Sequence, residues 1–175
     1  MDPPADGQAG PWASPRLAWR DEWCLGIEAL DTDHRELVRL LNRLLESQGQ
    51  ARGDSEGQPA DGGQGPVEPG QVADLAALIA HLREHFRREE ELMAAIRYAA
   101  LEDHCSEHAM QIAELLALCR DLENRGARRL AAESLEWIKR WCFDHFVTED
   151  RRLADAYWIH QAAANSSSSL RSWPT

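Results

Sequence analysis

Apolar side chains recur every three or four residues over most of this chain, the period of a helix buried along one side. From residue 71 to residue 125 the pattern persists without a Gly or Pro, and similar stretches cover about residues 31–47 and residue 127 past 157. No period-two alternation persists, so strands are not expected. The stripes include Leu37, Leu41 and Leu44; Leu75, Leu78, Leu82, Phe86 and Met93; Leu101, Ile112, Leu115 and Leu122; and Ile138, Cys142, Phe146 and Leu153.

The longest segment is too long for a single helix of a bundle. At about 1.5 Å per residue, a helix over residues 71–125 would extend about 80 Å. We therefore predict a break near residues 97–101, although neither Gly nor Pro marks it. With that break, the pattern predicts an all-α fold, an antiparallel up-down-up-down four-helix bundle.

Gly and Pro gather in segments that divide the chain. Residues 49–70 hold seven of the eleven glycines and three of the eight prolines, which predicts a long flexible loop after the first helix. Residues 1–17 carry four more prolines and are predicted to form a flexible arm. Residues 159–175 include four consecutive serines and are predicted to be a disordered tail. The bundle itself is expected over residues 18–158.

Composition argues against several classes of protein. With 19 basic and 30 acidic side chains the net charge is −11, so neither nucleic acid nor an anionic membrane surface is an expected partner. No apolar run approaches the roughly 18 residues that span a bilayer, and no secretory signal is recognised. A cytoplasmic protein is expected. The four cysteines lack C-x-x-C spacing, which favours buried thiols over disulfides or a zinc–thiolate site.

Polar side chains interrupt each apolar stripe at core positions. A single core histidine is usually hydrogen-bonded to a neighbour, so each of these residues alone is a weak signal. Each buried polar group without a partner would cost about 1–3 kcal/mol, and a domain with about 5–15 kcal/mol of net stability cannot carry many of them. Together they predict a shared metal site. The residues are His34, His85, Glu89, His104, His108, His145 and Asp150.

The number and kind of these donors restrict the metal. Five imidazoles and two carboxylates exceed the four ligands that one zinc ion takes. Two metal ions bridged by both carboxylates fit the donor set better. Imidazole and carboxylate suit iron, and no thiolate is placed to favour copper(I).

The motifs around these residues resemble those of the bacterial hemerythrins, four-helix bundles that bind dioxygen at a non-haem di-iron centre. The resemblance implies that His104, His108 and His145 bind one iron and that His34 and His85 bind the other. It implies that Glu89, Asp150 and an oxo or hydroxo group bridge the irons, which leaves one position of the second iron open to dioxygen. The resemblance covers residues 19–157 and is carried by Trp19, Leu25-Gly26-Ile27, Leu30-Asp31-x-x-His34-x-x-Leu37, His85-Phe86-x-x-Glu89-Glu90-x-x-Met93, Tyr98, His104-x-x-x-His108 and Trp141-x-x-x-His145-x-x-x-x-Asp150.

The function that this resemblance implies is reversible dioxygen binding for storage, delivery or sensing, without catalytic residues. One alternative is a di-iron oxidase or peroxidase, although ferritin-like oxidases are richer in carboxylates. Another is an interaction module whose partner surface changes with iron or oxygen occupancy. A monomer is expected, and the sequence names no protein partner.

The chain departs from the family pattern at several positions. Residues 49–70 form a longer and more Gly-rich loop, and Ala99 stands where a proline commonly follows the tyrosine. Cys142 and Phe146 replace aliphatic residues that usually line the oxygen pocket, a change that could alter oxygen affinity or autoxidation.

Other residues near the ligand positions are given ordinary structural roles. His81 is expected on a solvated flank, with contact to a ligand's surroundings as the alternative. Glu90 and Glu91 are expected on a solvated charged face. Trp137 and Trp141 are expected to pack in the core, and Trp141 could instead form a wall of the pocket.

Overall fold

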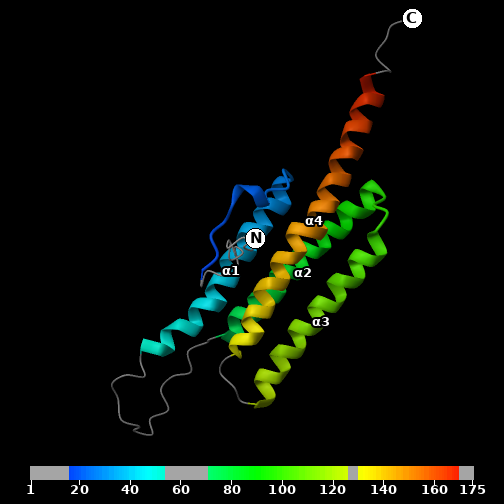
Figure 1. Cartoon of the computed structure of the whole chain (residues 1–175). Helices are drawn as coiled ribbons and strands as arrows, with labels where there is room; N and C mark the ends of the chain where they lie inside the picture. Colours follow the sequence, from blue (N-terminus) through cyan, green and yellow to red (C-terminus); the bar gives the residue numbers. More distant parts are fainter. Residues whose placement is uncertain (1–15, 54–70, 126–129, 170–175) are drawn as a thin grey trace, which may run out of the picture.

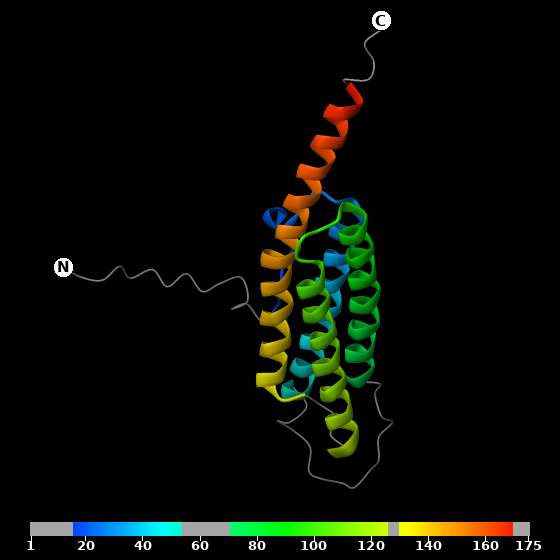
Figure 2. The ribbon, with the colours of Figure 1, turned by 90° about the vertical axis from the view of Figure 1, so that its right-hand side faces the viewer.

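The computed structural model describes residues 16–53, 71–125 and 130–169. Within these residues there is no strand. The helices lie side by side in two perpendicular views, and each runs opposite to the one before it (Figures 1 and 2). The prediction of an antiparallel four-helix bundle is confirmed. The elements are the short 3-10 helix η2 (Asp21–Trp23), α1 (Glu28–Gly53), α2 (Gln71–Ile96), α3 (Leu101–Arg125) and α4 (Ala132–Ser169).

The predicted break between the second and third helices lies at Arg97. This residue has a φ of 55°, in the left-handed region. The N–H of Tyr98 donates to the carbonyl of Met93 at 2.9 Å, and the N–H of Arg97 donates to the carbonyl of Ala94 at 3.2 Å. These two bonds form the Schellman arrangement that ends many helices, usually with Gly at the left-handed position. The break leaves no mark in the sequence because Arg takes that position.

Two helices extend further than the sequence predicts. α1 continues to Gly53, into the segment predicted as loop from residue 49, and α4 continues to Ser169, into the predicted tail. The tail prediction is therefore corrected over residues 159–169, which contain three consecutive alanines and neither Gly nor Pro. A Gly costs a helix only about 1 kcal/mol relative to Ala, so single glycines do not end α1. The rest of the predicted loop and tail lies outside the described residues.

The segment before α1 is tied to the bundle by backbone hydrogen bonds. Leu17 is buried, and its N–H and C=O both bond to the side-chain amide of Asn42 at 2.8 Å. The guanidinium of Arg151 donates to the carbonyls of Glu22 and Cys24. The prediction that the arm extends to residue 17 is therefore wrong at Leu17, which belongs to the bundle, and residues 1–15 lie outside the described part.

The core consists of two apolar clusters along the bundle. The smaller cluster comprises Leu25, Leu30, Met93, Leu153 and Ala154, and the larger one includes the remaining buried apolar residues of all four helices. On each helix one predicted ligand lies in the sequence between members of the two clusters. These residues are His34 on α1, Glu89 on α2, His108 on α3 and Asp150 on α4. A polar layer therefore crosses the bundle between two apolar regions.

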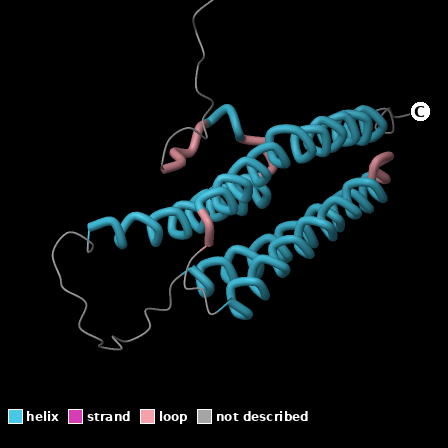
Figure 3. The backbone as a smooth tube through the Cα atoms, turned by 60° about the horizontal axis from the view of Figure 1, so that its bottom comes forward, coloured by secondary structure: helices cyan, strands magenta, loops and turns pink. Residues whose placement is uncertain are grey.

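Helices make up nearly all of the described chain (Figure 3). Among them, none combines the length and the apolar character that a bilayer crossing requires.

Candidate metal centre

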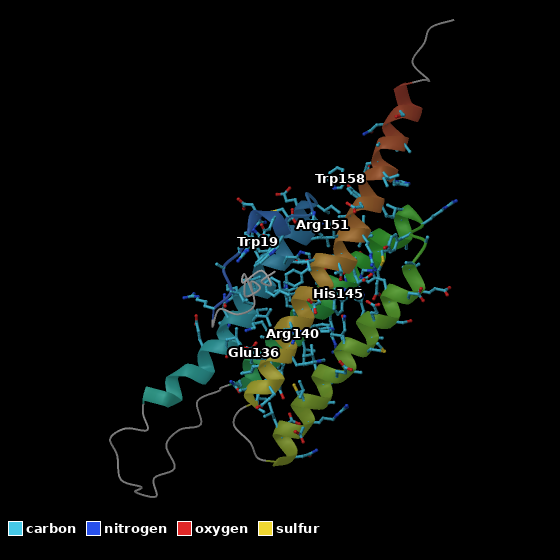
Figure 4. All side chains as sticks on the ribbon, in the orientation of Figure 1. Trp19, Glu136, Arg140, His145, Arg151 and Trp158 are labelled. Carbon is cyan, nitrogen blue, oxygen red and sulfur yellow. The ribbon has the colours of Figure 1, made fainter. Side chains whose placement is uncertain are left out.

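The structure brings all seven predicted ligand side chains together in the polar layer. They come from all four helices, and the most exposed of them, His145, is only 6 % accessible. Figure 4 labels His145 near the middle of the bundle. The inference that these positions share one site is thus consistent with their placement.

The donor atoms form two groups. In each group, one atom per residue lies within 4.8 Å of the others. Asp150 belongs to the second group and also approaches the first, because its Oδ1 lies 3.1 Å from Nε2 of His145 and 3.7 Å from Nε2 of His104. The first group is Glu89, His104, His108 and His145, and the second is His34, His85, Glu89 and Asp150.

Both carboxylates present one oxygen to each group. Oδ2 of Asp150 lies 3.0 Å from Nε2 of His34, while Oδ1 faces His145. Oε1 of Glu89 lies 3.6 Å from Nε2 of His85, and Oε2 lies 3.3 Å from Nε2 of His108. This is the placement that two carboxylates need to bridge two neighbouring cations.

Helix α4 serves both groups because its two site residues are not in line. A separation of five residues turns a helix by about 140°. His145 faces α3, with its Nε2 3.3 Å from Nε2 of His108, whereas Asp150 faces α1 and His34. The spacing that is a weak signal in the sequence is the one that lets α4 reach both sides.

Many polar atoms of the site have no hydrogen-bond partner within the described residues. They include both ring nitrogens of His85 and His104 and both carboxylate oxygens of Glu89. Each buried donor or acceptor left unpaired costs about 1–3 kcal/mol. A set of imidazole and carboxylate donors satisfies this need by binding cations such as iron or zinc. The residues present therefore fit a metal centre.

Burial and neighbouring charges distribute protons unevenly among the imidazoles. Burial disfavours a charged His85, but the carboxylates of Glu89, Asp150 and Asp33 outweigh it and raise the pKa of His85 to about 10. Burial and repulsion from the other imidazoles lower the pKa of His108 to about 2. Because imidazole must be neutral to bind a metal, metal binding displaces the proton of His85.

The two carboxylates are shifted in opposite directions. Burial and the nearby charge of Asp150 raise the pKa of Glu89 well above its ordinary value. Burial also opposes ionisation of Asp150, but His145, His34 and His85 outweigh it and hold its pKa well below its ordinary value. Two carboxylates at close range repel each other when both are charged, which moves their pKa values apart in this way. A pair of cations would let both ionise.

Outer partners hold some of the imidazoles. Nδ1 of His108 lies 3.0 Å from Oε1 of Glu90, and Nδ1 of His145 lies 3.2 Å from the side-chain amide of Gln111. Such partners fix the orientation of metal-binding histidines. The assignment of Glu90 to a solvated face is therefore incomplete, because its side chain, 41% exposed, also contacts a site imidazole; Gln111 is not among the residues predicted from the sequence. No spacing along the chain marks either residue, because both contacts cross between helices.

Asp33 is a second unanticipated residue. Its Oδ2 lies 3.6 Å from Nδ1 of His85, and Arg88 donates to both of its oxygens at 2.7 and 2.8 Å. His81 is half-buried and its Nε2 lies 3.0 Å from the Asp33 carbonyl oxygen. Of the two interpretations of His81, contact with a ligand's surroundings is the one observed.

Aromatic rings cover the imidazoles on the side of the larger apolar cluster. Phe86 stacks on His108 with ring centroids 3.7 Å apart, and Phe146 stacks on His34 at 4.7 Å. A cavity of about 10 Å³ lies among Leu37, Leu82, His85, Phe86, Trp141, Cys142, His145 and Phe146, which is close to the smallest space that holds one water molecule. Trp141 thus forms part of its wall. Burial raises the pKa of the Cys142 thiol, which stays protonated.

Sequence comparison agrees with this geometry. The family described as "Hemerythrin HHE cation binding domain" matches residues 25–157, a range that contains all seven buried donors. The chain belongs to this hemerythrin family. Its hemerythrin domain is accordingly a cation-binding domain, and the resemblance carried by its motifs is confirmed.

Bacteriohemerythrins of several organisms are similar along most of their length. That of Ralstonia nicotianae is 29% identical over 154 residues, covering 84% of this chain and 91% of the relative. That of Stenotrophomonas maltophilia is 26% identical over 144 residues, covering 82% of this chain and 83% of the relative. That of Clostridium acetobutylicum is 25% identical over 140 residues, covering 79% of this chain and 99% of the relative. No solved structure matches the chain.

Proposed function

We propose that the hemerythrin domain holds two iron ions and binds dioxygen reversibly, for storage, delivery or sensing. The observation that carries the proposal is the position of Glu89 and Asp150, each of which directs one oxygen to each imidazole group. His104, His108 and His145 would hold one iron, His34 and His85 would hold the other, and the two carboxylates would join them.

An imbalance between the two groups supports a small exogenous ligand on one side. The group that contains His34 and His85 has one imidazole fewer than the group on α3 and α4. The cavity of about 10 Å³ touches His85 of this group and His145 of the other, so the side is indicated by the imidazole count and not by the cavity. A space at the lower limit for one water molecule leaves no room for an organic substrate.

The surroundings of this cavity favour release of dioxygen over its conversion to peroxide. When bound, a pair of iron(II) ions would supply the electrons that hold dioxygen and would recover them when it leaves. Loss as peroxide requires protons. The described residues that line the cavity include no carboxyl group, and the buried thiol of Cys142 is a weaker acid than usual. Phe86 and Phe146 add apolar surface to the cavity wall.

The test is an absorption spectrum of the iron-loaded protein, reduced without air and then exposed to it. We expect a charge-transfer band that appears with dioxygen and disappears when dioxygen is removed, over repeated cycles. Zinc-loaded protein is the control, because zinc has no redox chemistry and should give no band. A spectrum that changes once and never recovers on removal of dioxygen would rule out reversible binding.

An oxidase or peroxidase reaction is the second candidate, and a groove between α3 and α4 favours it. This groove has a volume of about 370 Å³ and reaches His145 between Gln111 and Trp141. It offers room for a reducing substrate that the small cavity does not. Steady consumption of peroxide in the presence of such a substrate, at a rate that depends on its concentration, would support this candidate.

A further inference from the structure

Three aromatic rings form a column along one face of α4. Trp137, Trp141 and His145 are spaced four residues apart, so they follow each other turn by turn. The ring centroids of Trp137 and Trp141 are 6.1 Å apart with an interplanar angle of 18°, and those of Trp141 and His145 are 6.3 Å apart at 20°. Each ring is therefore tilted by 20° or less from the next one along the column.

The two ends of the column lie in different surroundings. The indole of Trp137 is 38 % exposed, whereas His145 is buried with its Nε2 3.1 Å from Asp150. Trp141, between them, is half-buried. The column thus connects the candidate metal centre with the surface.

The surface end lies in a negative environment. Trp137 lines two adjoining grooves between α3 and α4, of about 370 and about 610 Å³. Glu114 lines both grooves, Glu107 and Asp144 line the first and Glu133 lines the second. Among the described residues that line these grooves there is no Lys or Arg. Carboxylates around an exposed indole stabilise positive charge on it.

Other rings that contact the site are poorer carriers of charge. Phe86 and Phe146 stack on site imidazoles, but a benzene ring resists oxidation. Tyr98 lies edge-on to His104, with centroids 6.4 Å apart and an interplanar angle of 72°. Tryptophan is among the most easily oxidised side chains, and two of them stand in series on His145.

We infer that Trp141 and Trp137 pass electrons from the surface to the metal centre when hydrogen peroxide oxidises it, and so move the oxidising equivalents away from the buried ligands. The inference rests on the proposed iron centre but does not depend on reversible dioxygen binding. It gives the chain a protective electron-transfer function in addition to its ligand-binding site.

The electrons and atoms of this reaction balance. Reduction of hydrogen peroxide to two water molecules takes up two electrons and two protons. When both irons are already iron(III), the electrons come from Trp141, which is refilled from Trp137. Trp137 and one water molecule together lose two electrons and two protons: a C–H bond of the indole and an O–H bond of the water break, and a C–OH bond forms. The net products from Trp137 and hydrogen peroxide are therefore hydroxytryptophan and one water molecule. A soluble one-electron reductant such as ascorbate refills Trp137 instead, and no oxygen is then added.

The test locates the added oxygen by peptide mass spectrometry after iron-loaded protein reacts with hydrogen peroxide. Trp158 is the internal control, because it lies on the same helix, away from the column (Figure 4), and is 48 % exposed. A diffusing oxidant should modify Trp158 at least as much as Trp137. We expect more modification at Trp137, its suppression by ascorbate, and no such preference in zinc-loaded protein.

Two variants interrupt the column at different points. Trp141→Phe should reduce modification of Trp137 to the level of Trp158, and Trp137→Phe should move the modification to Trp141. Iron content is measured first in each protein. If the wild-type chain binds no iron, both this inference and the proposed function fail. If iron is bound and Trp137 shows no preference, if Tyr98 is modified instead, or if Trp141→Phe retaining its iron leaves Trp137 unchanged, this inference alone is overturned.

Discussion

Oδ2 of Asp150 lies 3.0 Å from Nε2 of His34, and both side chains are completely buried although 116 residues separate them. The other oxygen of Asp150 faces His145 on its own helix. One side chain therefore links α1 to α4 and one donor group to the other.

Replacing Asp150 by Asn should weaken binding at both halves of the centre, because an amide cannot supply two anionic oxygens. Loss of an outer partner of a metal ligand typically costs about 10–100-fold in affinity, and we expect a larger loss here. Iron bound per chain, measured after dialysis against a chelator, checks this. Asp155→Asn is the matched control, since Asp155 is exposed on the same helix. Equal iron retention in the two variants would contradict the bridging role.

Glu90 should matter for iron retention although it lies outside the two donor groups. Its Oε1 is 3.0 Å from Nδ1 of His108. Glu90→Gln replaces a charged acceptor by a weaker neutral one, so transfer of iron to a chelator should accelerate by about tenfold or more. Glu91→Gln is the neighbouring control, because Glu91 contacts Arg87 on its own helix. Similar rates in both variants would argue against orientation of His108 by Glu90.

The metal-free protein should lose stability in acid. The pKa of His108 falls from 6.5 to about 2 on folding, so between these values the unfolded chain binds more protons than the folded one. The free energy of unfolding should therefore decrease below about pH 6.5, by at most about 1.4 kcal/mol per pH unit for this group. Urea titrations at several pH values from 7 to 4 measure this decrease in the free energy of unfolding, to which His108 contributes the uptake of about one proton.

His85 should act in the opposite direction. Its folded pKa of about 10 lies above 6.5, so its contribution is complete below pH 6.5 and is lost as pH rises towards 10. The variant that tests the acid prediction is His108→Asn, which should reduce the fall in the free energy of unfolding below pH 6.5. His160→Asn, at an exposed position, should leave that fall unchanged. If the free energy of unfolding falls equally steeply below pH 6.5 in both variants, the assignment to His108 is contradicted.

Arg97→Gly should stabilise the bundle. Arg97 has a φ of 55° at an exposed helix end, and a left-handed conformation costs a residue with a Cβ about 1–2 kcal/mol. Part of this cost returns as extra freedom of the unfolded Gly, so a net gain of about 1 kcal/mol is expected. Equilibrium unfolding in urea measures it. Arg97→Ala keeps the Cβ and should not stabilise, and a gain equal to that of Gly would refute the explanation.

Gly26→Ala should destabilise the contact between the segment before α1 and Trp158 on α4. Gly26 has a φ of 76°, and an added Cβ would lie 3.3 Å from the Trp158 ring. We expect a loss of about 1–2 kcal/mol from the backbone conformation alone. The same substitution in a Trp158→Ala background removes the close contact and keeps the backbone cost. An unchanged unfolding midpoint in both backgrounds would contradict this.

The helices and most of the buried imidazole and carboxylate residues could be predicted from the sequence, because both depend on local spacing. His85 with Glu89 and His104 with His108 lie one turn apart, and the cost of burying them alone implies a shared site. The spacing between His145 and Asp150 does not by itself indicate a shared site, and Asp150 is predicted only from the family motif. The structure explains this spacing, because Asp150 faces a different helix from His145.

Contacts between helices could not be predicted in this way. Glu90, Gln111 and Asp33 reach their imidazoles across or along helix surfaces whose relative rotation no single-sequence pattern encodes. The extension of α4 to Ser169 could not be predicted because a run of serines is typical of a tail, although helix propensity alone does not forbid a helix there. The left-handed conformation of Arg97 could not be predicted either, because the chain carries no glycine at that position.

The central claim is that two groups of buried donors, joined by Glu89 and Asp150, hold a pair of iron ions. The most direct measurement is the iron content of the purified chain, by elemental analysis against protein concentration, after expression with iron available. The account predicts two irons for each chain. Chains that carry a single ion, or none, while correctly folded would contradict it.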